Sequence, residues 1–266
     1  IAYGARENGG IGHLRVAQYD GNQWVIEEVS QINDNISKNS VAFSPRGNPA
    51  VSFTARVEGY LRFAERINGS WVTENLPVSE RVGENSLIFD SSGAPFISFF
   101  DSSNNLKLAR KIQGLWRVET IATGVLPNHN NLVFTSDGKL AISYATSGEA
   151  KSAIYSGGQW IKTTIANGRF YDCSLAVSPE GILGGAFSAQ PRRVTYATYD
   201  GTRWTTQGTV TGFNPRLSYE LDGTPVIATG GGFSNNQNWG ITKFDGENWV
   251  PEIVDNLAVG NTVFAI

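Results

Sequence analysis

Aromatic and amide side chains gather at one point of this sequence in a pattern suited to binding sugars. Trp239 follows Asn236 and Asn238 at the end of a segment rich in Gly and Asn, which also holds Phe233. Aromatic rings stack on the C–H faces of sugars, and amides form hydrogen bonds with their hydroxyl groups. The structural alternative is that Trp239 only covers the end of a strand.

Arginine and tyrosine recur together in other connecting segments. Tyr60 lies four residues after Arg56, and Tyr171 stands between Arg169 and Asp172. Because such groups sit in variable loops, where function is commonly found, we expect a ligand to contact them. The predicted ligand-binding residues are Arg56, Tyr60, Asp101, Arg169, Tyr171, Asp172, Arg193, Arg216, Phe233, Asn236 and Trp239.

Catalytic and metal-binding patterns are weak. The two histidines, His13 and His129, have no metal-ligand spacing around them, and no nucleophile elbow or phosphate loop occurs. Asp101, Glu149 and Asp172 would form a glycosidase pair only if the fold brought two of them together. We predict no metal and no cofactor. A non-catalytic module that binds carbohydrate or protein is favoured, with a glycan hydrolase or lyase and a scaffold domain as alternatives.

These residues are spaced by a repeat that tryptophan marks. Six tryptophans recur at intervals of 44–47 residues, each two or three residues after a Gly. They are Trp24, Trp71, Trp116, Trp160, Trp204 and Trp249. A period of about 40–50 residues made of short strands indicates a β-propeller blade.

One full copy, residues 85–121, contains four short runs of β-branched and aromatic residues separated by turn residues. This pattern predicts a four-stranded antiparallel meander, with strands A to D from the inside outward. A Gly follows strand A in five copies, the middle of strand B is small in all six, and strand D carries mostly Glu. The glutamates are predicted to keep exposed edges from pairing.

The two ends of the chain are predicted to complete one blade. The first residues align with strands B, C and D, and residues 261–266 align with strand A. The predicted fold is therefore all-β, a six-bladed β-propeller of four-stranded antiparallel blades in one domain, residues 1–266. The C-terminal strand would close the ring.

The connections of this fold differ between its two faces. The A–B and C–D turns are short and uniform, whereas the B–C and D–A connections are longer and differ in every copy. We expect any site on the variable face, around the mouth of the central channel. Asparagines recur there and would bind water, an ion or a sugar, or bond local backbone. They are Asn39, Asn85, Asn130 and Asn261, with Cys173 and Pro215 in the remaining places.

Composition narrows the partners. The formal net charge is −3, which argues against nucleic acid because binding phosphates needs a basic face. The single Cys173 excludes an intramolecular disulfide, and no stretch has the apolar length of a membrane span. The chain lacks Met and begins at Ile1, which favours a mature exported protein or part of a larger one. An extracytoplasmic or secreted location and a monomeric ring are expected.

The repeat resembles the β-propeller repeats of secreted bacterial proteins over the whole chain. Residues 135–138, Thr-Ser-Asp-Gly, are loosely similar to the Asp-box of sialidase-type propellers, but the aromatic residue that completes an Asp-box is missing. That resemblance would imply arginines at the channel mouth. Arg6 and Arg56 occupy equivalent places, and Arg193 or Arg216 would be the third. The tyrosine–glutamate couple of such enzymes is not found.

Overall fold

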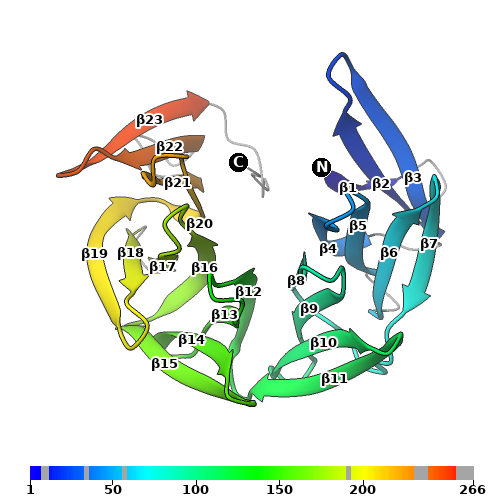
Figure 1. Cartoon of the computed structure of the whole chain (residues 1–266), viewed down its shortest axis with the longest axis horizontal. Helices are drawn as coiled ribbons and strands as arrows, with labels where there is room; N and C mark the ends of the chain where they lie inside the picture. The colour runs from blue at the N-terminus through cyan, green and yellow to red at the C-terminus, as the bar shows by residue number, and fades with distance from the viewer. Residues whose placement is uncertain (7–11, 33–35, 56–58, 190–192, 231–238, 256–266) are drawn as a thin grey trace. The chain divides into compact units, whose positions relative to one another are not determined.

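The chain folds into antiparallel β-sheets. The computed structural model describes residues 1–6, 12–32, 36–55, 59–189, 193–230 and 239–255, and these residues form 23 strands and no helix. The strands pair in chain order into six sheets (Figure 1). The chain divides into two compact units, Ile1–Pro127 and Asn128–Ile266.

Unit 1, Ile1–Pro127, holds three of the sheets. The first contains three described strands, β1 (Ala2–Arg6), β2 (Gly12–Tyr19) and β3 (Trp24–Ile32). The second contains β4 (Ile36–Phe43), β5 (Pro49–Ala55), β6 (Leu61–Ile67) and β7 (Ser70–Asn75). The third contains β8 (Asn85–Phe89), β9 (Pro95–Phe100), β10 (Leu106–Ile112) and β11 (Leu115–Ala122).

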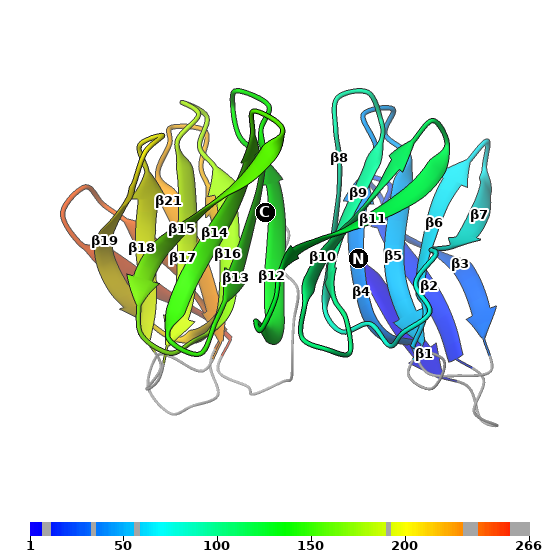
Figure 2. The same cartoon turned by 90° about the horizontal axis from the view of Figure 1, so that it is seen from below.

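Unit 2, Asn128–Ile266, holds three four-stranded sheets. Their first strands are β12 (Leu126–Phe134), β16 (Phe170–Val177) and β20 (Phe213–Tyr219). The middle strands are β13 (Leu140–Ala145), β14 (Glu149–Ser156), β17 (Leu183–Ala189), β18 (Arg193–Tyr199), β21 (Pro225–Gly230) and β22 (Trp239–Phe244). The outer strands are β15 (Gln159–Asn167), β19 (Trp204–Thr211) and β23 (Trp249–Asp255). Figure 2 shows the strands of each sheet running side by side.

The predicted meander is confirmed strand by strand. The copy at residues 85–121 becomes β8 to β11, joined in the order β11-β10-β9-β8 with antiparallel registers. The strands that open the chain also match the prediction. Residues 261–266, predicted to add a fourth strand to the first sheet, lie outside the described residues.

The repeated small and glycine positions have the predicted roles. The five glycines after strand A all have a positive φ, between 77° and 88°, as the turn into strand B requires. They are Gly47, Gly93, Gly138, Gly181 and Gly223. In the middle of strand B, Ser52, Ser98 and Ser143 are fully buried. Small side chains there let neighbouring twisted sheets approach closely.

Within unit 1, the core lies between consecutive sheets, and Trp71 and Trp116 close it from the outer strands. Leu61 and Phe63 of the second sheet share one apolar cluster with Ile97 of the third, and Trp116 packs against it. The rings of Phe63 and Trp116 meet edge to face, with centroids 5.4 Å apart. Trp71 packs in the same way against a cluster shared by the first and second sheets. Trp71 and Trp116 therefore each join two sheets of unit 1.

Truncating a repeat tryptophan is expected to destabilise the fold strongly. Trp116→Ala removes the ring that packs between the second and third sheets, and we expect a loss of about 3–5 kcal/mol in the free energy of unfolding. Urea denaturation measures this loss. Arg117→Ala, on the exposed neighbouring residue, is the control and should change stability by less than about 0.5 kcal/mol. Equal stability of the two variants would contradict the role given to Trp116.

Candidate functional site

The glutamates of the outer strands receive hydrogen bonds from the tryptophans of the next sheet. Glu27 on β3 accepts a hydrogen bond through Oε2 from the indole Nε1 of Trp71 on β7, at 3.0 Å. Arg66 on β6 places its Nε 2.8 Å from the same oxygen. A carboxylate is thus held between an indole N–H and a cation at the edge between two sheets.

The same arrangement occurs between the second and third sheets. Glu74 on β7 accepts a hydrogen bond from Trp116 Nε1 at 2.9 Å and pairs with Lys111 Nζ at 2.6 Å. Lys111 also lies over the ring of Trp116, 5.3 Å from its centroid. The prediction that the glutamates only protect edges missed these contacts. Their signal was present in the sequence, because Glu, Trp and a basic residue all recur with the repeat.

In unit 2 the residue that accepts the hydrogen bond of the repeat tryptophan is different. Thr163 stands in the Glu position, and the Nε1 of Trp204 donates instead to Ser152 Oγ, 2.9 Å away, which itself contacts Thr163 Oγ1 at 2.8 Å. In the next sheet a bulge turns Gln207 towards Thr198, and the buried Nε1 of Trp249 has no acceptor in the described part of the chain. Of the described residues, those at the Thr163 and Gln207 positions therefore lack the carboxylate–indole–cation cluster found at Glu27 and Glu74.

The two clusters of unit 1 differ in the oxygens that remain available. Both oxygens of Glu74 are engaged, Oε1 by Lys111 and Oε2 by Trp116. At Glu27, Oε2 takes both contacts, and Oε1 has no partner among the described residues. Of these two described glutamates, only Glu27 therefore offers a free carboxylate oxygen to a ligand.

Glu27 lines a pocket of about 220 Å³ within unit 1. Val16, Val25 and Pro49 give it an apolar wall, and Gln18, Asp20 and Glu27 give it polar groups. Ligand sites for drug-sized molecules span about 300–1,000 Å³, so this pocket suits a single small ring. Asp20 belongs to the β2–β3 turn and Pro49 follows the β4–β5 turn, which are uniform turns and not the variable connections.

The carboxyl group of Asp20 is an acceptor at neutral pH. Hydrogen bonds from the backbone N–H groups of Gln23 and Asn22 hold its pKa below the usual value. Both bonds go to Oδ1, at 2.9 Å and 2.8 Å. The pocket therefore presents carboxylate oxygens to hydroxyl donors.

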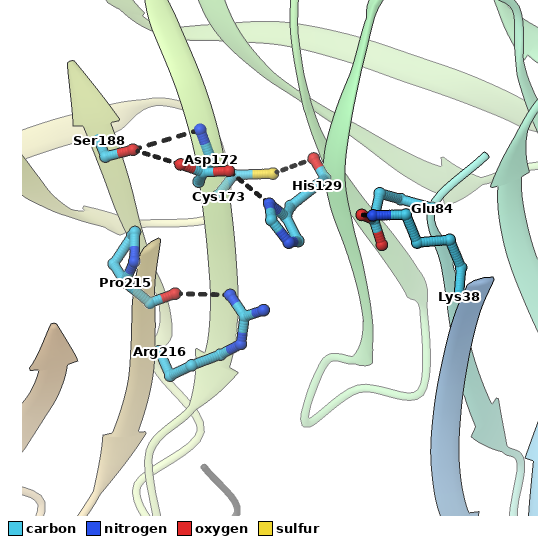
Figure 3. A network of polar contacts seen from close by, with 8 residues as sticks. All are labelled: Lys38, Glu84, His129, Asp172, Cys173, Ser188, Pro215 and Arg216. Carbon is cyan, nitrogen blue, oxygen red and sulfur yellow. Dashed lines mark hydrogen bonds and ion pairs between the residues drawn. The ribbon is translucent and has the colours of Figure 1, made fainter. Parts of the chain in front are cut away.

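Each unit also has one pair of polar side chains near the start of the first strands of its sheets, and Figure 3 shows these residues. In unit 1, Lys38 on β4 forms an ion pair with Glu84, which precedes β8. In unit 2, the Nδ1 of His129 on β12 pairs with Oδ1 of Asp172 on β16. Each of these residues directly precedes a member of the predicted ring at the channel mouth. Lys38, Glu84 and His129 were not among the ligand-binding residues predicted from sequence. Each pair joins the first strands of two consecutive sheets, which the sequence alone does not show.

Asp172 is ionised although it is largely buried. Burial raises the pKa of its carboxyl group, but hydrogen bonds from His129 and Ser188 and the charge of Arg216 outweigh this effect, so the pKa lies below its usual value. Ser188 Oγ donates to Oδ2 at 3.1 Å. The neighbouring Cys173 is inert, because burial raises the pKa of its thiol to about 12.

Asp101 is a structural anchor of its loop. Its Oδ1 accepts the backbone N–H groups of Ser103 and Asn105, both at 2.9 Å, and Oδ2 pairs with Lys107 at 2.9 Å. Lys107 also reaches Glu80, 2.7 Å away. Burial raises the pKa of Asp101, but these bonds outweigh it and the pKa is lowered. This carboxylate is fully engaged and shows no sign of a catalytic role.

The other predicted residues are spread over both units. Tyr60 is exposed in unit 1, and Arg193 is exposed at the start of β18 in unit 2. Arg169 lies over the ring of Tyr171 in unit 2, with the guanidinium carbon 5.5 Å from the centroid. Tyr171 and Asp172 are neighbours on β16, so the structure joins this pair to the His129 group.

Four predicted residues fall outside the described residues, namely Arg56, Phe233, Asn236 and Asn261. Trp239 begins β22, and nothing is described of its side chain.

Of the asparagines predicted at the channel mouth, Asn85 forms a hydrogen bond between two sheets. Asn39 and Asn85 take equivalent registers, opposite Phe53 and Phe99. The Oδ1 of Asn85 accepts a hydrogen bond from Ser52 Oγ of the neighbouring sheet, 2.6 Å away, in place of the local backbone bond considered from sequence. Asn130 is buried on β12.

Within the described ranges, no group of three or more His, Cys, Asp or Glu side chains is placed to hold a metal ion. No helix that is long and apolar enough to cross a membrane occurs in the same residues.

Comparison with known proteins identifies the fold. No protein-family model and no curated protein matches the chain. The fucose-recognising lectin of Aleuria aurantia, described as a six-bladed β-propeller, matches 98% of this chain and 96% of its own, with 14% identity and a TM-score of 0.62. The fold is a six-bladed β-propeller. The predicted fold class is thus confirmed.

Two more propeller structures show how widely the fold is shared. SapL1 lectin in complex with α-methyl fucoside matches 97% of this chain and 95% of its own, with 11% identity and a TM-score of 0.59. TolB from Acinetobacter baumannii matches 97% of this chain and 64% of its own, with 14% identity and a TM-score of 0.56. At these identities the likeness concerns the fold alone.

Removing the acceptor at Glu74 tests the contact between sheets. Glu74→Leu leaves Trp116 Nε1 and Lys111 without their carboxylate, and we expect a loss of about 1–3 kcal/mol in the free energy of unfolding. Glu74→Gln keeps a carbonyl oxygen for the indole and should lose less. Glu247→Leu, in the exposed β22–β23 turn, is the control. Equal losses for Glu74→Leu and the control, measured by urea denaturation, would refute this contact.

Proposed function

We propose that this chain is a non-catalytic carbohydrate-binding module and that Glu27 lies at its binding site. The observation that carries the proposal is a carboxylate with one free oxygen, fixed in place by Trp71 and Arg66, on the wall of a small pocket. Carboxylates accept strong hydrogen bonds from hydroxyl groups, and a fixed acceptor costs little entropy on binding.

The remaining walls suit one neutral sugar ring. Val16, Val25 and Pro49 would cover a C–H face, while Asp20 and Glu27 accept hydroxyl hydrogens. Two of the similar structures are lectins whose descriptions name fucose or α-methyl fucoside. A neutral deoxysugar of this kind has a methyl group for the apolar wall and hydroxyls for the carboxylates. We therefore propose α-methyl fucoside as the first probe.

Catalysis is less well supported than binding. A glycosidase needs one carboxyl group that stays protonated at working pH, which requires a raised pKa. The carboxyl groups of Asp101, Glu149 and Asp172 all have a pKa below the usual value. Lysine and hydroxyl partners surround Glu149 as well. These carboxylates are suited to accept hydrogen bonds.

The extracytoplasmic or secreted location predicted from sequence remains part of this proposal. So does the prediction that the variable connections contribute ligand contacts. The Glu27 pocket adds a site that includes residues of the uniform turns.

Titration with α-methyl fucoside and with other neutral methyl glycosides tests the site. For whichever of these glycosides binds the wild type, we expect Glu27→Gln to weaken binding by about tenfold or more, because the charged acceptor is lost. Glu74→Gln is the matched control, since it changes the same repeat position where both oxygens are already engaged. Isothermal titration calorimetry gives the affinities, and chromatography of the incubated sugar checks for products.

Three outcomes would overturn the proposal. They are the absence of binding to every neutral glycoside, equal affinity of Glu27→Gln and wild type, and release of a cleaved product.

A further inference from the structure

Arg216 stands where the repeat places a short hydrogen-bond acceptor. Ser40 Oγ on β4 accepts the backbone N–H of Leu87 in the next sheet, at 3.0 Å. In unit 2, Asn131 Oδ1 accepts the N–H of Leu175 at 2.7 Å, and Ser174 Oγ accepts that of Leu217 at 3.0 Å. Arg216 holds the corresponding position on β20, and it cannot accept a hydrogen bond. Positions that break a structural repeat are expected to be functional or strained sites.

Most N–H groups of the Arg216 guanidinium form no hydrogen bond with the described residues. Its Nη1 donates one hydrogen bond, to the carbonyl oxygen of Pro215 at 2.9 Å. Among the residues that the structure describes, no carboxylate lies within 4 Å of this half-buried cation. Asp172 is near enough for the charge of Arg216 to lower its pKa, but its oxygens accept from His129 and Ser188. Arg216 therefore offers a planar set of free N–H groups.

His129 supplies a complementary acceptor beside it. Asp172 is ionised and can only accept, so the Nδ1 of His129 carries the hydrogen that bonds to it. In the neutral imidazole this leaves Nε2 with a lone pair. Figure 3 shows the side chain of Arg216 extending from β20 towards the His129–Asp172 pair. Donors from Arg216 and an acceptor from His129 thus occur together.

We propose that Arg216 and His129 form a second binding site, in unit 2, for a hydroxy-carboxylate such as a hexuronate sugar. A carboxylate matches the fork of a guanidinium with two parallel hydrogen bonds, and a hydroxyl of the same ligand donates to His129 Nε2. Asp172 positions the imidazole and does not touch the ligand. The site is independent of the pocket at Glu27, and it draws on Asp172 and Arg216, which were selected from sequence.

The unit 1 counterpart shows why the site is confined to unit 2. There the pair is Lys38 with Glu84, in which the cation and the carboxylate satisfy each other. Ser40, two residues after Lys38, holds the repeat position of Arg216, and its hydroxyl oxygen accepts the backbone N–H of Leu87. Of these two described pairs, only that of unit 2 combines an imidazole paired with a carboxylate and a nearby guanidinium that has donors to spare.

Calorimetric titration of the whole chain with sodium D-glucuronate, and with methyl β-D-glucoside as the uncharged comparison, tests the proposal. We expect glucuronate to bind and the glucoside to bind at least tenfold more weakly at this site. Arg216→Gln should weaken glucuronate binding by at least about tenfold. Arg203→Gln, which changes an exposed arginine paired with Asp200 in the β18–β19 turn, is the matched control and should bind as wild type does.

Glu27→Gln separates this site from the proposed function, because it should leave glucuronate binding unchanged. Thermal unfolding and circular dichroism of Arg216→Gln establish that it is folded. Backbone NMR shifts in wild type then locate the ligand and should move at residues 129, 172 and 216. The proposal is wrong if glucuronate does not bind, if a folded Arg216→Gln binds it equally well, or if the shifts move only around Glu27.

Discussion

The hydrogen bond from an indole N–H to a carboxylate of the preceding sheet is the contact on which unit 1 depends. Trp71 and Trp116 each pack their ring against a core cluster shared by two sheets, and this brings a polar N–H to the edge of that core. A donor left there without an acceptor would cost about 1–3 kcal/mol. Glu27 and Glu74 remove this cost for Trp71 and Trp116. The same contact fixes a carboxylate at the sheet edge, which is a useful ligand group.

The copies of this contact differ in whether the carboxylate still has an oxygen that a ligand could bind. Glu74 is saturated by Lys111 and Trp116, whereas Glu27 keeps one oxygen beside a pocket. Unit 2 has Thr163 and Gln207 in place of the carboxylate, and both units carry a polar pair near the start of their first strands. A repeat fold allows such divergence, because each copy needs only enough of the pattern to pack against its neighbours.

The tryptophan period, the glycine turns and the small residues of strand B were enough to predict the fold, because each reflects packing that every copy must satisfy. The site was harder to predict. Asp101 has the sequence surroundings of a ligand residue, yet it anchors its own loop through Ser103 and Asn105. Glu27 looked like edge protection, since its partner Trp71 lies 44 residues away and meets it only across two sheets. Spacing predicts strands, but it does not show which oxygen of a side chain remains free.

The indole N–H signals in a proton–nitrogen NMR spectrum of the whole chain test the central claim most directly. We predict that Trp71 and Trp116 give downfield, exchange-protected signals that move upfield in Glu27→Leu and Glu74→Leu respectively, because these changes remove the acceptor oxygen. The Trp249 signal should be unaffected by either change. Titration with a bound neutral sugar should then shift Trp71 and leave Trp116 in place. Indole signals that ignore both substitutions would contradict the claim that the carboxylates join the sheets.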